Sequence, residues 1–284
     1  MSGPSANGVA DQPAVVAVGS PPPRNAAAGS KFERTQRRHA RLPLRVLRSL
    51  LPLHTLRELK LEARLTWLRL TRRGIDGRFA DARGVMVNIG CGPHGQPGWI
   101  NIDCAPAEGV TCVRDCRTSL PLPTGSARGI FTEHFFEHLD YYEEAPRFLM
   151  ECRRVLEPGG TLRVIVPDGG KYLRAYVEDG WDSLRSFSSL TSWDPTSEER
   201  PFSTLREVLP FRTKMEVINY HFRQMGVHRF SYDHETLAEL LVECGFESVT
   251  VREYGTSALP ELAIDRDFRA PESLVVEASA PGLA

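Results

Sequence analysis

The stretch VMVNIGCGPHGQPGWINID, residues 85–103, decides the fold of this 284-residue chain. Its apolar start, 85–89, is rich in β-branched residues and breaks at Gly90, as expected of a buried parallel strand that meets its loop. Four glycines and two prolines then prevent regular structure and let the backbone approach a ligand. A second strand, 99–102, delivers Asp103, whose carboxylate is placed to accept hydrogen bonds from a ribose diol.

Residues Gly90 to Gly95 also spell the G-x-G-x-x-G fingerprint of dinucleotide-binding proteins. In that fingerprint the last glycine opens a helix whose amides hold a pyrophosphate. No helix is predicted here, because only ten residues separate Gly92 from Asp103 and two of them are proline. A nicotinamide-dependent oxidoreductase is therefore disfavoured, and a nucleoside without phosphates suits the loop better. A plain glycine turn between two strands is the alternative.

The stretch resembles motif I of the class I methyltransferases, in which NIGCG-type loops are followed by a strand that ends in an acid. The resemblance implies S-adenosylmethionine as the cofactor. It also implies an α/β, Rossmann-like sheet that is mostly parallel, has an antiparallel edge hairpin and carries helices on both faces. Gly90, Cys91, Gly92 and Asp103 are the cofactor-binding residues that this resemblance implies.

The following segments continue the same order of motifs. A short third strand, 110–113, leads to Asp115, and a fourth strand is predicted over 129–133. In the resembled family an Asp or Asn after the third strand meets the adenine amino group, which implies that Asp115 and Cys116 belong to the cofactor site. The LPLPTGSARGI stretch, 120–130, is similar to the family's LPF-D-S-D-I signature, with two of its acids replaced.

The motif with the most specific resemblance to a family is ECRRVLEPGGTLRVIVPD, 151–168. It closely resembles the E-x-x-R-V-L-x-P-G-G-x-L-x-I-x-V-P-D run of methyltransferases grouped with sugar and cell-envelope biosynthesis. The pattern predicts a helix over 141–156, a stop at 157–160 and a buried fifth strand over 161–166. The resemblance implies O-methylation of a sugar, a glycan or a related small-molecule hydroxyl.

The C-terminal part completes the expected domain. The polar and aromatic segment 171–217 stands where the resembled family covers its acceptor site. Asp233 is expected to cap a helix that runs to Cys244, and strands are predicted over 248–254 and 273–278. These last two strands match the antiparallel edge hairpin of the class I methyltransferase sheet.

The run EHFFEH, 133–138, is the candidate catalytic segment. It straddles the end of the fourth strand, at the edge where ligands bind in open α/β sheets. A sugar hydroxyl must lose its proton during methyl transfer, and histidine is the side chain best suited to accept it near neutral pH. We expect His134 or His138 to be this base, with Glu137 orienting an imidazole or contacting the cofactor. The alternative is that these residues only shape the loop.

His134 to His138 also spell the H-x-x-E-H motif of zinc peptidases. That motif needs both histidines on one helix face and a third ligand downstream. Because His134 is expected to end a strand, no metal site is predicted, although whether the reaction needs a divalent ion stays open.

Downstream, HRFSYDHETLAELLVECGF, 228–246, resembles the C-terminal motif of the family. His228 and Tyr232 are alternatives for the acceptor pocket, beside a structural role for His228.

The chain before residue 81 differs from the expected methyltransferase domain, 81–284. Residues 1–30 are rich in Ala, Gly, Pro and Ser and are predicted to be a disordered tail. Residues 31–80 form a basic segment, in which 31–73 hold 13 Lys or Arg against 3 Glu, a net charge of +10 that leaves −11 for the rest of the chain.

Two amphipathic helices are predicted in this basic segment, 41–51 and 55–73, separated by Pro52. Thr55 and Glu58 have the spacing of a capping box at the start of the second helix. Such a basic helix docks on the domain, lies on an anionic membrane surface or closes over a bound ligand. A non-catalytic methyltransferase-like protein that binds a membrane or a partner through this helix is therefore the alternative to an enzyme.

The composition limits the kinds of protein that this chain can be. A hydrophobic content of 41% is enough for a sizeable core, and a net charge of −1 argues against general nucleic-acid binding. The six cysteines show no CxxC pair and no zinc spacing, so they are expected to be reduced cytosolic thiols. No secretory leader and no run of about 20 apolar residues is found. We expect a cytoplasmic protein, with peripheral contact to the inner face of the membrane left open.

Overall fold

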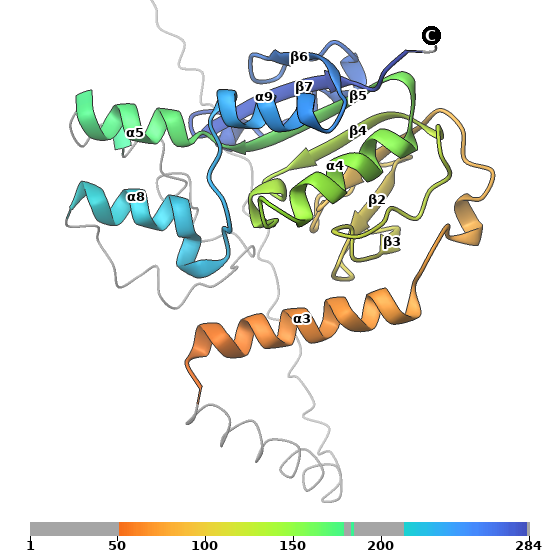
Figure 1. Ribbon diagram of the computed structural model, residues 1–284, viewed down its shortest axis with the longest axis horizontal. Helices are drawn as coiled ribbons and strands as arrows, with labels where there is room; N and C mark the ends of the chain where they lie inside the picture. Colours follow the sequence, from red (N-terminus) through yellow and green to blue (C-terminus); the bar gives the residue numbers. More distant parts are fainter. Residues whose placement is uncertain (1–50, 179–182, 185–212, 283–284) are drawn as a thin grey trace, which may run out of the picture. The chain divides into compact units, whose positions relative to one another are not determined.

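The computed structural model describes residues 51–178, 183–184 and 213–282, and Pro52–Ala284 form one compact unit (Figure 1). The predicted tail, 1–30, lies outside the described residues. The first predicted basic helix, 41–51, also lies outside them except for residue 51. Most of the segment expected to cover the acceptor site, 171–217, lies outside them as well.

Seven strands form a single sheet in the order β3-β2-β1-β4-β5-β7-β6 (Figure 1). Strands β1 to β5 pair in parallel, whereas β7 runs antiparallel to both β5 and β6. This order and its antiparallel edge are those of the Rossmann-like class I methyltransferase sheet, which confirms the predicted fold class. The strands are β1 (Val85–Ile89), β2 (Ile100–Asp103), β3 (Cys112–Val113), β4 (Ala127–Glu133), β5 (Leu156–Pro167), β6 (Glu247–Val251) and β7 (Ser273–Ser279).

The register aligns the ends of the central strands. Ile89, the last residue of β1, pairs with Ile102 on β2 and with Thr132 on β4. The chain therefore leaves β1 at Gly90 and β4 at His134 along one edge of the sheet. Ligands of open α/β sheets bind at this carboxyl edge.

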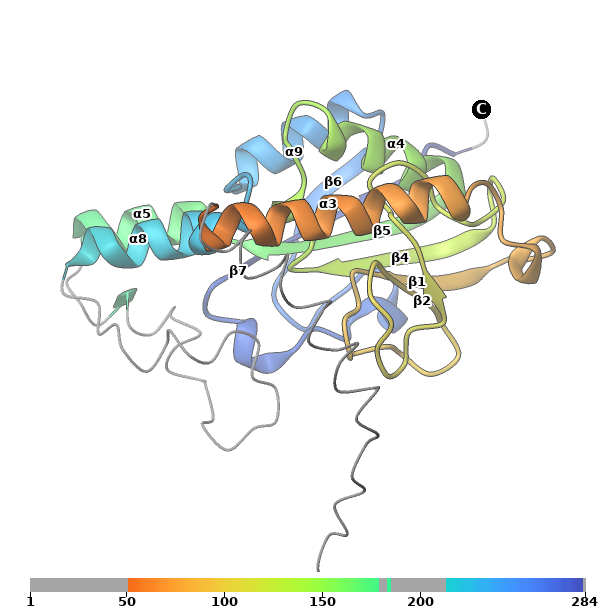
Figure 2. The ribbon, with the colours of Figure 1, turned by 90° about the horizontal axis from the view of Figure 1, so that it is seen from below.

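The two faces of the sheet are covered differently (Figure 2). Successive strand residues point to opposite faces. The side chains on one face pack against the helices α4 (Glu144–Val155) and α9 (His234–Glu243). The side chains on the other face pack against the segment between β6 and β7. This segment contains the 3-10 turns η4 (Pro260–Leu262) and η5 (Asp267–Arg269). The first face includes Val87, Ile130, Val164 and Val276, and the second includes Met86, Phe131, Ile165 and Val275.

The remaining helices lie around this sheet. Both views show α5 and α8 side by side, and buried residues of the two helices form a separate small core (Figures 1 and 2). None of the described helices combines the length and the apolar character needed to cross a bilayer. The elements are α3 (Leu53–Thr71), η1 (Gly77–Phe79), η2 (Phe136–His138), α5 (Gly169–Glu178), α8 (Lys214–Arg223) and η3 (Gln224–Gly226).

The predicted cap of α3 is wrong. The helix begins at Leu53 after Pro52, and no side chain caps its first turn. A proline has a fixed φ near −65° and no amide hydrogen, so it suits a position just before a helix, where amide hydrogens lack helical partners. Thr55 and Glu58 consequently lie inside the helix rather than forming a capping box at its start.

The helix ends at Val155, close to the stop predicted at 157–160, but the fifth strand begins earlier than predicted, at Leu156 rather than at residue 161. Ala127 pairs with Leu156, but Gly129 pairs with Thr161, so the extra residues of β5 form an irregularity in the pairing. Gly159 adopts a φ of +77°, which glycine tolerates at no steric cost. The sequence pattern marks the glycines correctly but not the strand that passes through them.

The other predicted elements occur with shifted ends. The third strand has only two residues, Cys112–Val113, and α4 begins at Glu144 rather than at 141. Asp233 caps α9 as predicted, because its Oδ1 accepts a hydrogen bond of 2.9 Å from the backbone amide of Thr236. All six cysteines are free thiols.

Arg163 is a fully buried charge in the middle of β5. Its guanidinium donates to Oδ1 of Asp265 (2.8 Å), to Oε1 of Glu277 (2.7 Å) and to the backbone carbonyl of Thr256 (2.7 Å). The two carboxylates and the carbonyl thereby compensate a charge that is otherwise costly to bury. Because Arg163 stands within a short apolar run, the sequence does not indicate that this side chain is buried in a network of ion pairs.

Replacing Arg163 with Met should lower the free energy of unfolding by about 3–5 kcal/mol, because two buried carboxylates lose their counter-charge. Urea unfolding followed by circular dichroism measures this difference. The matched control is Arg128→Met on β4, whose ion pair with Glu261 (3.0 Å) is 44% exposed on both sides. That control should cost about 0–1 kcal/mol, and equal losses in the two variants would contradict the role given to Arg163.

Candidate functional site

The loop after β1 turns on left-handed glycines. Gly90 has a φ of +71° and Gly92 a φ of +52°. The amide of Gly90 donates to the carbonyl of Ile102 (2.8 Å), which holds the start of the loop against β2. No helix occurs between β1 and β2, as predicted, so no helix N-terminus is present there to hold a pyrophosphate.

The structure brings Gly92 and Asp103 together. Oδ2 of Asp103 accepts a hydrogen bond from the Gly92 amide (3.0 Å), and Oδ1 accepts one from the Ala105 amide (2.8 Å). Each carboxylate oxygen has room for a further donor, and the residue is only half-buried. A Cβ atom placed on Gly92 would meet nothing within 4 Å, so the space above the loop is open. This arrangement fits a nucleoside with a free diol.

The two cysteines predicted for the cofactor site are buried. Cys91 is 6% exposed and Cys116 is 5% exposed. Burial, with a smaller contribution from Asp103, raises the pKa of the Cys91 thiol to about 12. Burial likewise raises the pKa of the Cys116 thiol well above its usual value. Both thiols are therefore protonated near neutral pH and act as small apolar groups rather than as nucleophiles.

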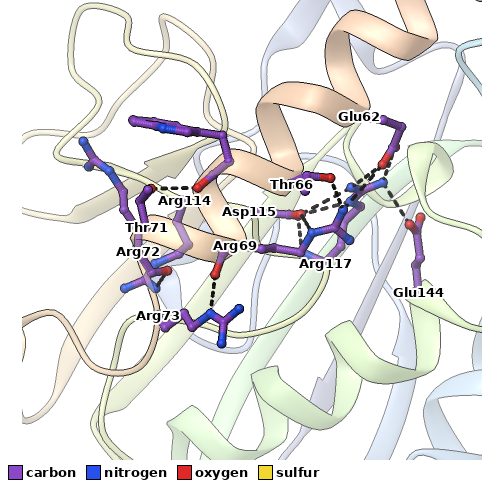
Figure 3. Close-up of polar contacts among 11 residues, drawn as sticks. Glu62, Thr66, Arg69, Thr71, Arg72, Arg73, Arg114, Asp115, Arg117 and Glu144 are labelled. Atoms are coloured by element: carbon purple, nitrogen blue, oxygen red, sulfur yellow. Dashed lines mark hydrogen bonds and ion pairs between the residues drawn. The ribbon is translucent and has the colours of Figure 1, made fainter.

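Asp115 is held by arginines in a network that reaches α3 (Figure 3). Nε of Arg117 donates to Oδ1 of Asp115 (3.1 Å), and Nε of Arg69 lies 3.6 Å from Oδ2. Arg117 also bonds Glu62 on α3 (2.8 Å) and Glu144 at the start of α4 (2.9 Å). The network joins α3, the loop after β3 and α4, so α3 is packed as part of this unit.

A hollow of about 320 Å³ lies beside this network. Guanidinium groups dominate its lining, and Figure 3 shows those of Arg69, Arg72, Arg73 and Arg114. The side chain of Arg114 donates to the backbone carbonyls of Arg72 and Gly74. Its lining residues are Arg69, Arg72, Arg73, Arg114, Asp115, Thr118 and Ser119. The hollow is strongly cationic.

A buried glutamate and three histidines meet beyond the end of β4. As predicted, β4 ends at Glu133 and a short turn, η2, carries Glu137 and His138. Glu137 is 1% exposed. Its Oε1 lies 3.3 Å from Nδ1 of His134 and 3.8 Å from Nε2 of His228. The structure thus brings the three predicted residues of this segment together and adds His228 to them.

Both ring nitrogens of His134 are occupied. Nδ1 accepts a hydrogen bond from Nη1 of Arg269 (3.1 Å), so Nε2 carries the hydrogen and donates to Oγ of Ser273 (2.9 Å). Burial, together with the positive charge of Arg269, lowers the pKa of His134. Its backbone also has a φ of +53°, which is rare outside glycine. His134 is a fixed, neutral imidazole.

His138 and His228 each have one ring nitrogen bound to a backbone carbonyl. Nδ1 of His138 donates to Val227 (3.1 Å), and Nδ1 of His228 donates to His221 (2.7 Å). The Nε2 atoms of both rings therefore carry lone pairs. Burial lowers the pKa of His228 and keeps its ring neutral.

Some residues of the site have no sequence signal that could have revealed them. Arg269 ends η5 and Ser273 begins β7, and they lie 135 and 139 residues from His134. Phe135 lies within the quoted EHFFEH run, and a Cβ atom on Gly90 would come within 2.6 Å of its side chain. Phe135 therefore packs directly on Gly90 and links the glycine loop to the histidine cluster.

Comparison with known proteins finds a family described as a methyltransferase domain, which matches residues 100–164, from β2 into β5. The sequence matches none of the curated proteins with which it was compared. The matched domain and the sheet order together support a methyltransferase that uses S-adenosylmethionine.

Solved structures of methyltransferases resemble this chain with low sequence identity and low TM-scores. An S-adenosylmethionine-dependent methyltransferase from Mesorhizobium loti is 18% identical, with 70% of this chain and 91% of that chain covered and a TM-score of 0.39. One from Methanosarcina mazei is 18% identical, with 72% and 96% covered and a TM-score of 0.40. One from Aquifex aeolicus is 16% identical, with 72% and 86% covered and a TM-score of 0.36.

Replacing Arg117 with Met should release α3, because the buried Asp115 loses its main counter-charge and Glu62 loses its partner. We expect amide hydrogen exchange along α3 to become at least about tenfold faster, since broken buried ion pairs cost several kcal/mol. Arg64→Met, at an exposed position of the same helix, is the control and should leave exchange unchanged. Unchanged protection of α3 in the Arg117 variant would show that the network does not hold the helix.

Proposed function

We propose that the protein transfers a methyl group from S-adenosylmethionine to a hydroxyl group of a sugar, a glycan or a related small molecule. The observation that carries the proposal is the proximity, at one edge of the sheet, of a glycine–carboxylate loop and a histidine–glutamate cluster. Phe135 joins the two by packing on Gly90. The matched methyltransferase domain covers the strands between them.

In this proposal the backbone of Gly90, Cys91 and Gly92 approaches the nucleoside, and Asp103 accepts hydrogen bonds from its diol. The bound cofactor supplies a methyl group that is already activated by its sulfonium, so the protein contributes mainly alignment. Asp115 and Cys116 are assigned to the adenine end of the site. The arginines around Asp115 fix its side chain in place.

The acceptor hydroxyl must lose a proton, and the cluster contains two predicted bases. His134 is the weaker candidate because Arg269 and Ser273 occupy both of its ring nitrogens. His138 is only half-buried, and its bond to Val227 leaves Nε2 ready to accept the proton. Glu137 next to it would stabilise the imidazolium that forms. We therefore assign the base to His138 and a positioning role to His134.

The acceptor is assigned to the region where β5 ends and α5 and α8 begin to cover the edge. A cavity of about 10 Å³, the room that one water molecule needs, lies there between His134 and the residues of α8. Its lining is polar and includes Tyr220, Arg269 and Glu272. A cavity of this size holds one water-sized polar group, such as a single hydroxyl at the edge of a larger acceptor.

A second candidate is a non-catalytic protein that binds a membrane or a partner through its basic helix. Trp67 and Leu70 on α3 are 55% and 63% exposed, although both are large and apolar. Arg72 and Arg73 follow them and line the cationic hollow. Basic and exposed apolar side chains together favour anionic interfaces. Cosedimentation of the full chain with anionic vesicles, compared with turnover on a panel of sugars, separates the two functions.

Asp103→Ala should weaken the binding of S-adenosylhomocysteine by about 10–100-fold, because hydrogen bonds from the diol to a carboxylate contribute about 1.5–3 kcal/mol. Isothermal titration calorimetry measures both affinities. Asp81→Ala, at an exposed aspartate outside the site, should bind like the unmodified protein. The absence of binding heat in the unmodified protein, or an unchanged affinity in Asp103→Ala, would defeat the cofactor assignment.

His138→Ala should lower kcat by about 10²–10⁴-fold and remove the acidic limb of the pH–rate profile, because a protonated imidazole cannot act as a base. Mass spectrometry of methylated sugars measures the rate. His234→Ala removes an exposed histidine at the start of α9 and is the control. If the acidic limb persists in His138→Ala, another group accepts the proton.

A further inference from the structure

The carboxylate of Glu137 is buried without a hydrogen bond. Its side chain is 2% exposed, and within the described part of the chain neither Oε1 nor Oε2 has a hydrogen-bond donor. An ionised carboxylate without a partner is costly to bury, and such groups in native proteins commonly mark a bound water or ion. Glu137 therefore needs a positive or donating partner.

The neighbouring histidines do not provide this partner. Nδ1 of His134 already accepts a hydrogen bond from Arg269, so it presents a lone pair to Glu137 rather than a hydrogen. Nδ1 of His228 donates to the carbonyl of His221, so its Nε2 also presents a lone pair. The carboxylate is thus surrounded by acceptors, an arrangement that is repulsive unless a cation lies among them.

We propose that Glu137, His138 and His228 form a binding site for a first-row divalent transition-metal ion such as Zn²⁺. Each residue offers one ligand atom, and the three atoms lie within 4.8 Å of one another. Imidazole nitrogens and a carboxylate suit Zn²⁺ and its neighbours better than Mg²⁺ or Ca²⁺. Three protein ligands leave a fourth position open, as in catalytic rather than structural zinc sites.

The surroundings of the two histidines are those of metal ligands. A metal-bound imidazole usually donates its other ring nitrogen to a carbonyl or a carboxylate, which fixes the tautomer and the ring orientation. Val227 supplies such a carbonyl to His138, and His221 supplies one to His228.

Backbone hydrogen bonds join the segment that carries Glu137 and His138 to the segment that carries His228. The amides of Arg229 and Phe230 donate to the backbone carbonyl of Glu137 (2.8 and 3.3 Å). A tetrahedral ion with bonds of about 2.0–2.1 Å holds its ligands about 3.4 Å apart, so the three side chains must close on the ion. These two bonds hold the backbone of residues 229 and 230, next to His228, against that of Glu137.

This site differs from the H-x-x-E-H motif of zinc peptidases. That motif uses both histidines, whereas here His134 is held by Arg269 and Ser273, and His228 takes its place. Binding of the ion does not rest on the proposed methyl transfer. If both hold, His138 is a ligand instead of the base whenever the ion is bound, because its Nε2 cannot do both, and the open position of the ion would lower the pKa of the acceptor hydroxyl.

The test uses the purified full-length protein after treatment with a chelator. Isothermal titration with Zn²⁺ should show one ion per chain, and the melting temperature should rise with the Zn²⁺ concentration. His228→Ala and Glu137→Gln should each weaken binding at least about 100-fold, since even the supporting groups of a metal site contribute 10–100-fold. His234→Ala, an exposed histidine outside the cluster, should bind Zn²⁺ normally, and Mg²⁺ should not bind at the same concentration.

Two results would overturn the proposal: no binding of Zn²⁺ at micromolar concentrations, or equal affinity in the unmodified protein, His228→Ala and Glu137→Gln. Among the described residues no cysteine belongs to a group of three possible ligands, so the thiols do not offer a competing site. Glu137→Gln keeps the shape of the side chain and carries the test if His228→Ala does not fold. Failure to bind S-adenosylhomocysteine would defeat the proposed function without affecting this result.

Discussion

The parallel pairing of β1 with β2 on one side and with β4 on the other is the constraint on which the site depends. It brings three chain segments to the same edge of the sheet, although they are far apart in sequence. One contributes a glycine backbone, one a half-exposed carboxylate and one a buried carboxylate with its histidines. Phe135 then sets the spacing between the first and the third by lying on Gly90.

The sequence predicts well those features that depend on neighbouring residues. Apolar runs with β-branched residues mark the strands, glycines with positive φ mark the turn after β1, and Asp233 marks the start of α9. The position of Asp103 beside Gly92 also follows, because Gly92 lies in the loop after β1 and Asp103 ends the neighbouring strand β2. The family resemblance that rests on these motifs predicted a mostly parallel sheet with an antiparallel edge hairpin, and the sheet has this form.

Features that depend on residues distant in sequence could not be predicted. The ion pairs of Asp115 come from α3 as well as from Arg117, and the partners of His134 come from η5 and from the first residue of β7. Pro52 starts α3 although Thr55 has the better capping residue type. In each case the deciding contact is made by packing or by a backbone preference that a short motif does not contain.

The position of Arg163 has a consequence for the order in which the domain is assembled. Its partners lie 93 to 114 residues further along the chain, in the segment after β6 and on β7. While the chain emerges from the ribosome, the first five strands therefore exist before the groups that neutralise this guanidinium. The centre of the sheet excludes water only after the C-terminal hairpin has been synthesised. Loss of that hairpin by truncation or proteolysis would accordingly affect the middle of the domain and not only its edge.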